Sequence, residues 1–154
     1  KVGILSNNEK EHSLLKLLNS QKLEQAIVFT NRRDETHSLT QYLKSKKVHC
    51  EALAGDIPQK KRLATLNRFK EGSLKFLIAT DVAGRGIHVD GISHVINYTL
   101  PEDPEDYVHR IGRTGRAGNE GTSISFVTED DAFNLPAIEE YVGMQAKCEQ
   151  PQFD

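Results

Sequence analysis

Residues 27–56 read IVFTNRRDETHSLTQYLKSKKVHCEALAGD, and they contain a strand, a helix and a second strand in that order. The apolar run Ile27–Phe29 ends at polar residues, which predicts a buried strand. An apolar stripe at helical spacing predicts a helix over about residues 34–46, and Val48–Leu53 predicts the next strand. Two strands joined by a helix favour a parallel pair with a right-handed crossover.

The same alternation continues on both sides of this stretch. Apolar runs predict three more strands, at Phe76–Ala79, His94–Tyr98 and Thr122–Val127. Further helices are predicted around Leu14–Leu18, over Gln59–Glu71 with Gly72 as its end, and from Pro136 onward. This pattern indicates an α/β fold, in which a parallel sheet has helices on both faces. The sequence has no interior linker or repeat, so we expect a single domain over residues 1–154.

The composition is that of a folded globular protein. Of the 154 residues, 37% are hydrophobic and 27% are charged, which excludes collagenous, low-complexity and wholly disordered chains. No apolar run is long enough to cross a membrane, and the first residues do not resemble a secretory signal. We therefore expect a cytoplasmic protein with no membrane association. Cys50 and Cys148 are isolated from each other, so no metal site is expected.

Charge is distributed unevenly along the chain. The formal net charge is −2, but residues 1–116 hold 19 Lys and Arg against 14 Asp and Glu, and residues 117–154 hold 1 against 8. A basic body suits a polyanionic partner such as a nucleic acid. The acidic end is either a second docking surface or a solvated exposed segment.

Polar or basic residues follow three of the predicted strands, in the segments Thr30–Arg33, Ala54–Asp56 and Thr80–Gly86. The carboxyl ends of parallel strands meet at one edge of a sheet, and ligands bind there. Glycines allow a ligand to approach the backbone closely, while hydroxyl, amide and guanidinium groups donate hydrogen bonds to phosphate. The sequence therefore predicts one functional edge made of these segments.

The densest concentration of chemically active side chains is HRIGRTGR at residues 109–116. Arg110, Arg113 and Arg116 lie close together if the segment begins as a helix, and guanidinium groups suit phosphate oxygens. Like charges at this density repel one another unless an anion compensates them. The anion is either a bound phosphate or, as the alternative, the acidic run Glu102–Asp106.

These segments resemble a known family. HRIGRTGR is similar to motif VI of DEAD-box RNA helicases, and residues 27–31 resemble motif IV. Gly55-Asp56 with Gln59 and Arg62 resembles motif IVa, and TDVAGRGI at residues 80–87 resembles motif V. The resemblance covers the whole chain as the second of two RecA-like (P-loop NTPase-type) domains. The ending NLPAIE at residues 134–139, with His88, further resembles the bacterial RhlB type.

The resemblance implies a role for individual residues. The implied catalytic residues, which reach the ATP phosphates, are Arg113 and Arg116, and Gly86 and His88 are further implied nucleotide contacts. The implied contacts to the RNA backbone are Asn31, Arg33, Gly55, Gln59, Arg62, Thr80 and Arg85. The residues implied to couple the two RecA-like domains are Asp81, His109 and Arg110.

Two positions depart from the family pattern, which has alanine at Gly84 and aspartate at His88. A neutral imidazole can bond a ribose hydroxyl but brings no negative charge. The chain also lacks both a GxxxxGKS/T phosphate loop and an Asp-Glu-Ala-Asp sequence. The resemblance implies ATP with Mg²⁺ as the cofactor, and because these two motifs are missing from the chain, it assigns the metal ligands to the first RecA-like domain.

The leading hypothesis is the second half of an ATP-dependent RNA helicase that separates short duplexes in bacterial RNA degradation. The expected partners are RNA without sequence preference, the N-terminal RecA-like domain, and the RNase E scaffold of the degradosome. The isolated domain is expected to be inactive. The alternatives are a noncatalytic RNA-binding or partner-docking module, and the equivalent domain of a superfamily 2 DNA helicase, which the motifs match less closely.

Overall fold

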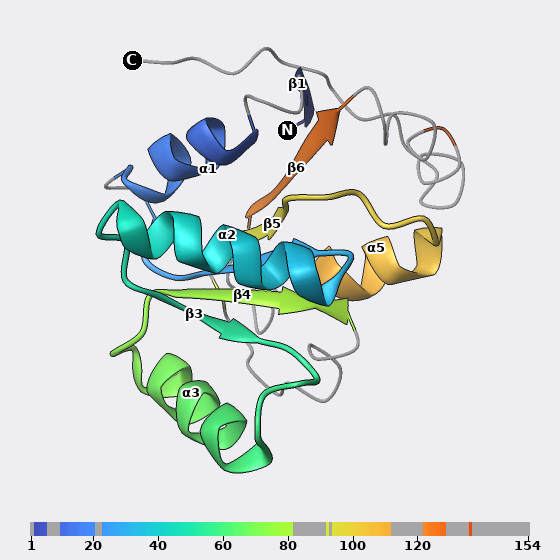
Figure 1. The fold of residues 1–154 in the computed structure, drawn as a ribbon. Helices are drawn as coiled ribbons and strands as arrows, with labels where there is room; N and C mark the ends of the chain where they lie inside the picture. The colour runs from blue at the N-terminus through green and yellow to red at the C-terminus, as the bar shows by residue number, and fades with distance from the viewer. Residues whose placement is uncertain are drawn as a thin grey trace.

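The structure is a computed structural model of the 154-residue chain. It describes residues 2–5, 10–20, 23–81, 92, 94–111, 122–128 and 136. The strands within these residues are β1 (Val2–Leu5), β2 (Ala26–Thr30), β3 (Cys50–Leu53), β4 (Phe76–Thr80), β5 (His94–Asn97) and β6 (Thr122–Thr128). The helices are α1 (Lys10–Leu18), α2 (Arg33–Ser45), α3 (Gln59–Glu71) and α5 (Pro104–Ile111) (Figure 1).

The described strands form one parallel sheet in the order β1-β6-β5-β2-β4-β3. The chain runs from β2 out to the edge strand β3, returns to β4, and then crosses to the other side of β2 to form β5. The strand order therefore changes direction around β2, which is where parallel α/β sheets bind ligands. The predicted α/β class and parallel sheet are confirmed.

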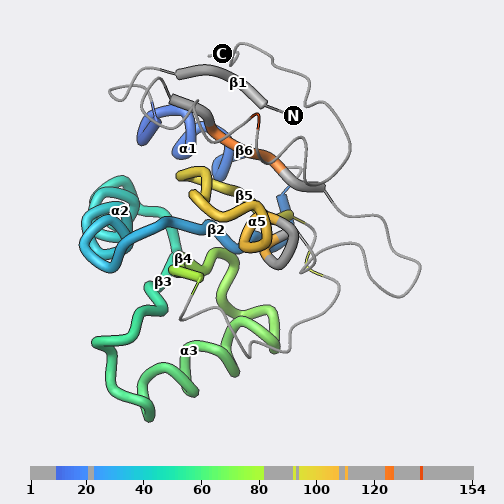
Figure 2. Tube along the Cα trace, turned by 90° about the vertical axis from the view of Figure 1, so that its right-hand side faces the viewer, coloured from blue at the N-terminus to red at the C-terminus, as the bar shows by residue number. Residues whose placement is uncertain are grey.

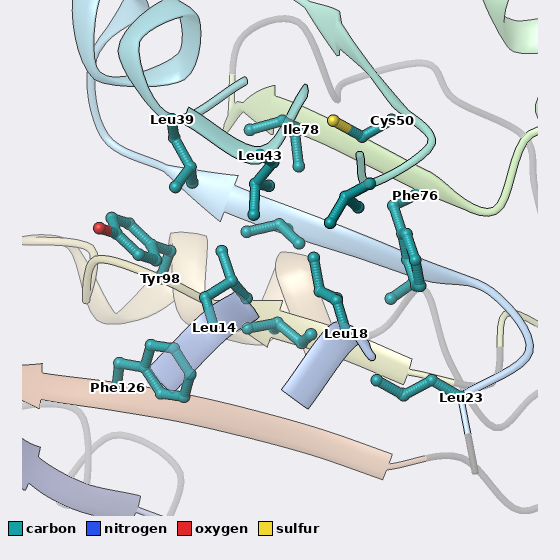
Figure 3. Packing of buried hydrophobic residues seen from close by; sticks show 14 residues of the cluster. Leu14, Leu18, Leu23, Leu39, Leu43, Cys50, Phe76, Ile78, Tyr98 and Phe126 are labelled. Atoms are coloured by element: carbon teal, nitrogen blue, oxygen red, sulfur yellow. The ribbon is translucent and has the colours of Figure 1, made fainter. Parts of the chain in front are cut away.

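The strands are apolar on both faces because both faces are covered. Within β2, Val28 packs in a cluster with Leu14 of α1 and Leu43 of α2, part of which Figure 3 shows. The neighbouring Ile27 faces the other way and packs in a second cluster with Phe69 of α3. Figures 1 and 2 show α2 and α5 on opposite sides of the strands. Burial on both faces explains why β2 and β4 are continuous apolar runs.

Both long helices end at a residue in the left-handed conformation. The helix α3 has the predicted bounds and ends at Gly72, whose φ is +85°. The helix α2 ends differently, because Lys47 adopts a φ of +64° and the N–H of Val48 bonds back to the Leu43 carbonyl at 3.0 Å. Because of this bond, the strand begins at Cys50 and not at Val48, where the sequence predicted its start. A lysine in this conformation carries strain that glycine does not.

The elements β1 and α5 are not among the sequence predictions. The short segment Val2–Leu5 is interrupted by Gly3 and becomes a strand by pairing with β6. The helix α5 follows familiar signals, because Asp103 accepts a hydrogen bond from the Glu105 N–H at 2.9 Å and Pro104 is the first helical residue. Apart from Pro136 itself, the helix predicted from Pro136 lies outside the described residues. In the part of the chain that is described, no helix is long and apolar enough to cross a membrane.

We expect Lys47→Gly to raise the free energy of unfolding by about 1 kcal/mol, because glycine adopts the left-handed conformation without steric cost. Urea unfolding of the chain would measure this change. The matched control is Lys46→Gly, since Lys46 has a φ of −97° and gains nothing from glycine. Equal effects of the two substitutions would contradict the assignment of strain to Lys47.

Candidate functional site

The parallel register brings the polar ends of three strands together. The end of β2, Thr30, pairs with Thr80 at the end of β4, and Asn97 at the end of β5 is in register with the β2 residue before Thr30. The next residues along the chain, Asn31 and Asp81, therefore lie at the same edge of the sheet. Thr80 is only 9% exposed. Of the predicted edge, the segments after β2 and β4 therefore begin side by side in the described part of the chain, and the end of β5, which the prediction did not include, lies beside them.

Arg110 of α5 is the centre of this edge. Its side chain is 1% exposed, and it binds both carboxylate oxygens of Asp81, with Nε–Oδ1 at 2.5 Å and Nη2–Oδ2 at 2.6 Å. The same guanidinium donates from Nη2 to the Asn31 Oδ1 at 2.8 Å and from Nη1 to the Thr99 carbonyl at 2.7 Å. One buried arginine thus joins the end of β2, the end of β4 and the segment after β5.

The side chain of Asn31 has a defined orientation. Its Oδ1 faces Arg110, which can only donate, and its Nδ2 donates to the Leu100 carbonyl at 2.9 Å. Because both neighbours have fixed donor or acceptor character, the amide cannot be turned around. The second N–H of Nδ2 has no acceptor among the described residues. The exposed Asn31 is therefore held ready to donate outward.

The pairing of Arg110 differs from the alternative that the sequence left open. Its ion-pair partner is Asp81 rather than the acidic run Glu102–Asp106, from which Asp103 instead caps the start of α5. The guanidinium also lies 5.3 Å from the centroid of the Phe29 ring, which is a cation–π distance. A buried charge of this kind is stable only when it is fully paired.

A second group of predicted residues surrounds the start of α3. Arg62 donates to the Gln59 Oε1 at 3.3 Å, and the Nε of Arg62 is buried with no partner among the described residues. The first turn contains Lys60 and Lys61 but no acidic residue. Pro58 precedes it and has no side-chain acceptor to cap the first backbone N–H groups. Unbonded N–H groups and cations at a helix start together favour an anion.

The loop after β3 lies beside this helix start. A Cβ added at Gly55 would meet no atom within 4 Å, so the described residues leave the space beside it open. The Nε2 of His37 donates to the Asp56 carboxylate at 2.9 Å. This hydrogen bond, with a smaller effect from the charge of Arg33, holds the pKa of Asp56 below its ordinary value. His37 has no role among the sequence predictions, yet it connects α2 to the loop after β3, in which Gly55 is a predicted RNA contact.

Several predicted residues cannot be placed. His109 lies in α5, and Arg113 and Arg116 follow shortly after the end of that helix at Ile111. The residues outside the described part are Gly84, Arg85, Gly86, His88, Arg113 and Arg116. Their roles stay predictions. Among the described residues, no group of three or more His, Cys, Asp or Glu side chains could hold a metal ion.

Fold and site together define a RecA-like α/β domain whose candidate ligand edge lies at the carboxyl ends of its strands. Residues 9–118 match the family described as the helicase conserved C-terminal domain. The chain belongs to this family, and its resemblance to DEAD-box helicases of the RhlB type is confirmed by the relatives below.

The relatives and solved structures are similar over nearly the whole chain. ATP-dependent RNA helicase RhlB of Pseudomonas putida is 54% identical over 150 residues, which is 97% of this chain and 38% of that relative. The E. coli DEAD-box protein SrmB, solved bound to regulator of ribonuclease activity A, has a TM-score of 0.90 and 34% identity over 99% of this chain and 94% of that one. S. cerevisiae Dbp5, solved with RNA and ADP BeF3, has a TM-score of 0.87 and 35% identity, covering 97% of this chain and 40% of that one.

We expect Arg110→Met to lower the free energy of unfolding by about 3 kcal/mol, because it leaves a mostly buried Asp81 carboxylate without its partner. Urea unfolding of the chain at neutral pH would measure the loss. The matched control is Arg32→Met, since Arg32 pairs with Asp34 at 3.3 Å on the open surface, with side chains 74% and 73% exposed. That substitution should change stability by less than about 1 kcal/mol. A loss for Arg110→Met as small as the control would contradict the central role of the buried pair.

Proposed function

We propose that the chain, as a single domain over residues 1–154, is the second RecA-like half of an ATP-dependent RNA helicase. The observation that carries the proposal is the position of Arg110. It holds Asn31 and Asp81 at the ligand edge, and its helix leads directly to the segment with Arg113. One side chain thus joins the ends of β2 and β4 to the helix that precedes Arg113. Arg113 is the predicted arginine finger, meaning the arginine that reaches the ATP phosphates from the second domain.

The RNA-binding half of the proposal is supported by two features at one edge that favour the binding of an anion. The first is the outward N–H of Asn31, and the second is the cationic, uncapped start of α3 with Gln59 and Arg62. Both suit phosphate oxygens, which carry little sequence information. The similar Dbp5 structure is bound to RNA. The proposed RNA contacts are Asn31, Arg33, Gly55, Gln59, Arg62, Thr80 and Arg85.

The nucleotide half rests on the segment after α5. Arg113 and Arg116 would reach the ATP phosphates when the two RecA-like domains close, with Gly86 and His88 nearby. An arginine supplied in this way raises the rate of phosphoryl transfer by about 10³ to 10⁵. Both oxygens of Asp81 are bonded to Arg110, which fits the expectation that the Mg²⁺ ligands come from the first domain. Asp81, His109 and Arg110 would couple the two halves.

The proposed cellular setting rests on the similarity to the RhlB type. The chain spans 38% of the length of the P. putida RhlB, so the proposed activity belongs to a longer protein. We propose a cytoplasmic role in RNA degradation, with the RNase E scaffold of the degradosome as a partner. The similar SrmB structure holds a regulator of ribonuclease activity, which supports a protein-docking role for domains of this kind.

The first test is ATP hydrolysis by the two-domain protein, meaning this chain joined to an N-terminal RecA-like domain. We expect RNA to stimulate hydrolysis, and Arg113→Ala to lower the stimulated rate at least about 10³-fold, because the finger is lost. Arg32→Ala, an exposed arginine at the same edge, is the control and should leave the rate nearly unchanged. The chain alone should hydrolyse no ATP above background. Two-domain protein without RNA-stimulated activity would favour the noncatalytic module instead.

The second test is RNA binding by the chain as salt is varied. Because the proposed contacts are mostly to phosphate, affinity should fall steeply with salt. Arg62→Ala should weaken binding to all RNA sequences alike and reduce the slope of log K against log salt by about 1. Arg68→Ala makes the same charge change on the same helix, where Arg68 contacts His49 at 3.1 Å, and should leave the slope nearly unchanged. Affinity that does not vary with salt would rule out a phosphate-based interface.

A further inference from the structure

A carboxylate outside the family motifs, Glu35, closes a ring of hydrogen bonds at the ligand edge. Its Oε1 accepts from the Asn31 backbone N–H at 3.0 Å, and its Oε2 accepts from the Thr99 hydroxyl at 2.8 Å. Arg110 completes the ring from the opposite side through the Asn31 Oδ1 and the Thr99 carbonyl. The four members come from α2, the end of β2, the segment after β5, and α5.

Asn31 and Thr99 are each bound by both Glu35 and Arg110. Glu35 binds the backbone of Asn31, while Arg110 binds its side chain. At Thr99 the arrangement is reversed, because Glu35 binds the side chain and Arg110 binds the backbone. Lys10 of α1, 8% exposed, donates to the same Thr99 hydroxyl at 3.1 Å and fixes it further. Neither Asn31 nor Thr99 can rotate without breaking a charge-assisted bond.

Electrostatics alone would make Glu35 harmful to RNA binding. A carboxylate in contact with the backbone of a phosphate-binding residue repels phosphate, so its removal should tighten binding. Its helix gains from a negative charge in the first turn, but Asp34 supplies the same charge one residue earlier. The geometry of the ring is thus the feature that distinguishes Glu35 from Asp34.

We propose that Glu35 is a positioning residue that holds the Asn31 amide and Arg110 in the arrangement needed for RNA binding and RNA-stimulated hydrolysis. The inference rests on the proposed function. Glu35 does not touch RNA in this assignment, and it acts by fixing the end of β2 against the segment after β5. Its loss therefore weakens RNA binding, although it removes a negative charge.

The test compares Glu35→Ala with Asp34→Ala in the two-domain protein. Both remove one carboxylate from the first turn of α2, and Asp34 pairs on the surface with Arg32. We expect Glu35→Ala to raise the Kd for a single-stranded RNA oligonucleotide about tenfold and to lower RNA-stimulated hydrolysis. Asp34→Ala should leave the Kd unchanged or lower it slightly.

Further variants separate positioning from folding. Glu35→Gln keeps one oxygen acceptor for the Asn31 N–H, so its effect should lie between those of the unsubstituted protein and Glu35→Ala. Thr99→Val removes the hydroxyl that donates to Glu35 and should weaken RNA binding, as Glu35→Ala does. The two effects should not add in the Glu35→Ala, Thr99→Val double variant, because both open the same ring. Thermal unfolding of each variant identifies any that fail to fold, and Glu35→Gln serves as the measured variant if Glu35→Ala does not fold.

The outcomes distinguish the two proposals. A two-domain protein without RNA-stimulated hydrolysis would overturn the proposed function and this inference with it. If the unsubstituted protein is stimulated by RNA but the Glu35 variants bind RNA as tightly as Asp34→Ala, the inference alone is overturned. Weaker binding by Glu35→Ala and Thr99→Val, but not by Asp34→Ala, establishes the positioning role.

Discussion

The buried ion pair between Arg110 and Asp81 is the contact on which the ligand edge depends. Parallel pairing of β2 with β4 places Asp81 next to Asn31, and the helix α5 brings a guanidinium over both. The pair fixes the distance of α5 from the sheet, since each nitrogen of Arg110 has a hydrogen-bond acceptor. The position of every group at this edge of β2 then follows from that of one side chain.

Apolar side chains in place of both Arg110 and Asp81 could stabilise the fold equally well, because desolvation offsets much of what a buried pair gains. Apolar side chains cannot, however, fix the orientation of the polar groups around them. A guanidinium has five donors in a plane, and here they define the orientation of an amide, a carboxylate and a backbone carbonyl at once. In the described part of the chain, this polar network lies at the edge that contains the proposed RNA contacts Asn31 and Thr80. Elsewhere in the sheet, apolar clusters on both faces are sufficient.

Much of the fold could be predicted because its signals are local. The bounds of α3 follow from its apolar stripe and from Gly72, and β2 and β4 are apolar runs that end at threonine. The strand β1 could not be predicted, since four residues containing a glycine become a strand only beside β6. In the site, the motif pattern predicted roles for Asn31, Asp81 and Arg110, and the structure joins these three residues by hydrogen bonds. Glu35 and Thr99 carry no local signal, because their contact depends on how β2 and β5 pair.

The strand β1 has a consequence for how the chain folds. It pairs only with β6 among the described strands, from Val2 with Ser125 to Leu5 with Thr128, so its partner is synthesised more than 100 residues after it. The β2, β3 and β4 strands can assemble with α2 and α3 long before that. Among the described strands of this domain, the first to be synthesised is therefore among the last to be paired, and until then VGIL is an apolar segment without a partner strand. Chaperones that bind such segments have their longest opportunity at this end of the domain.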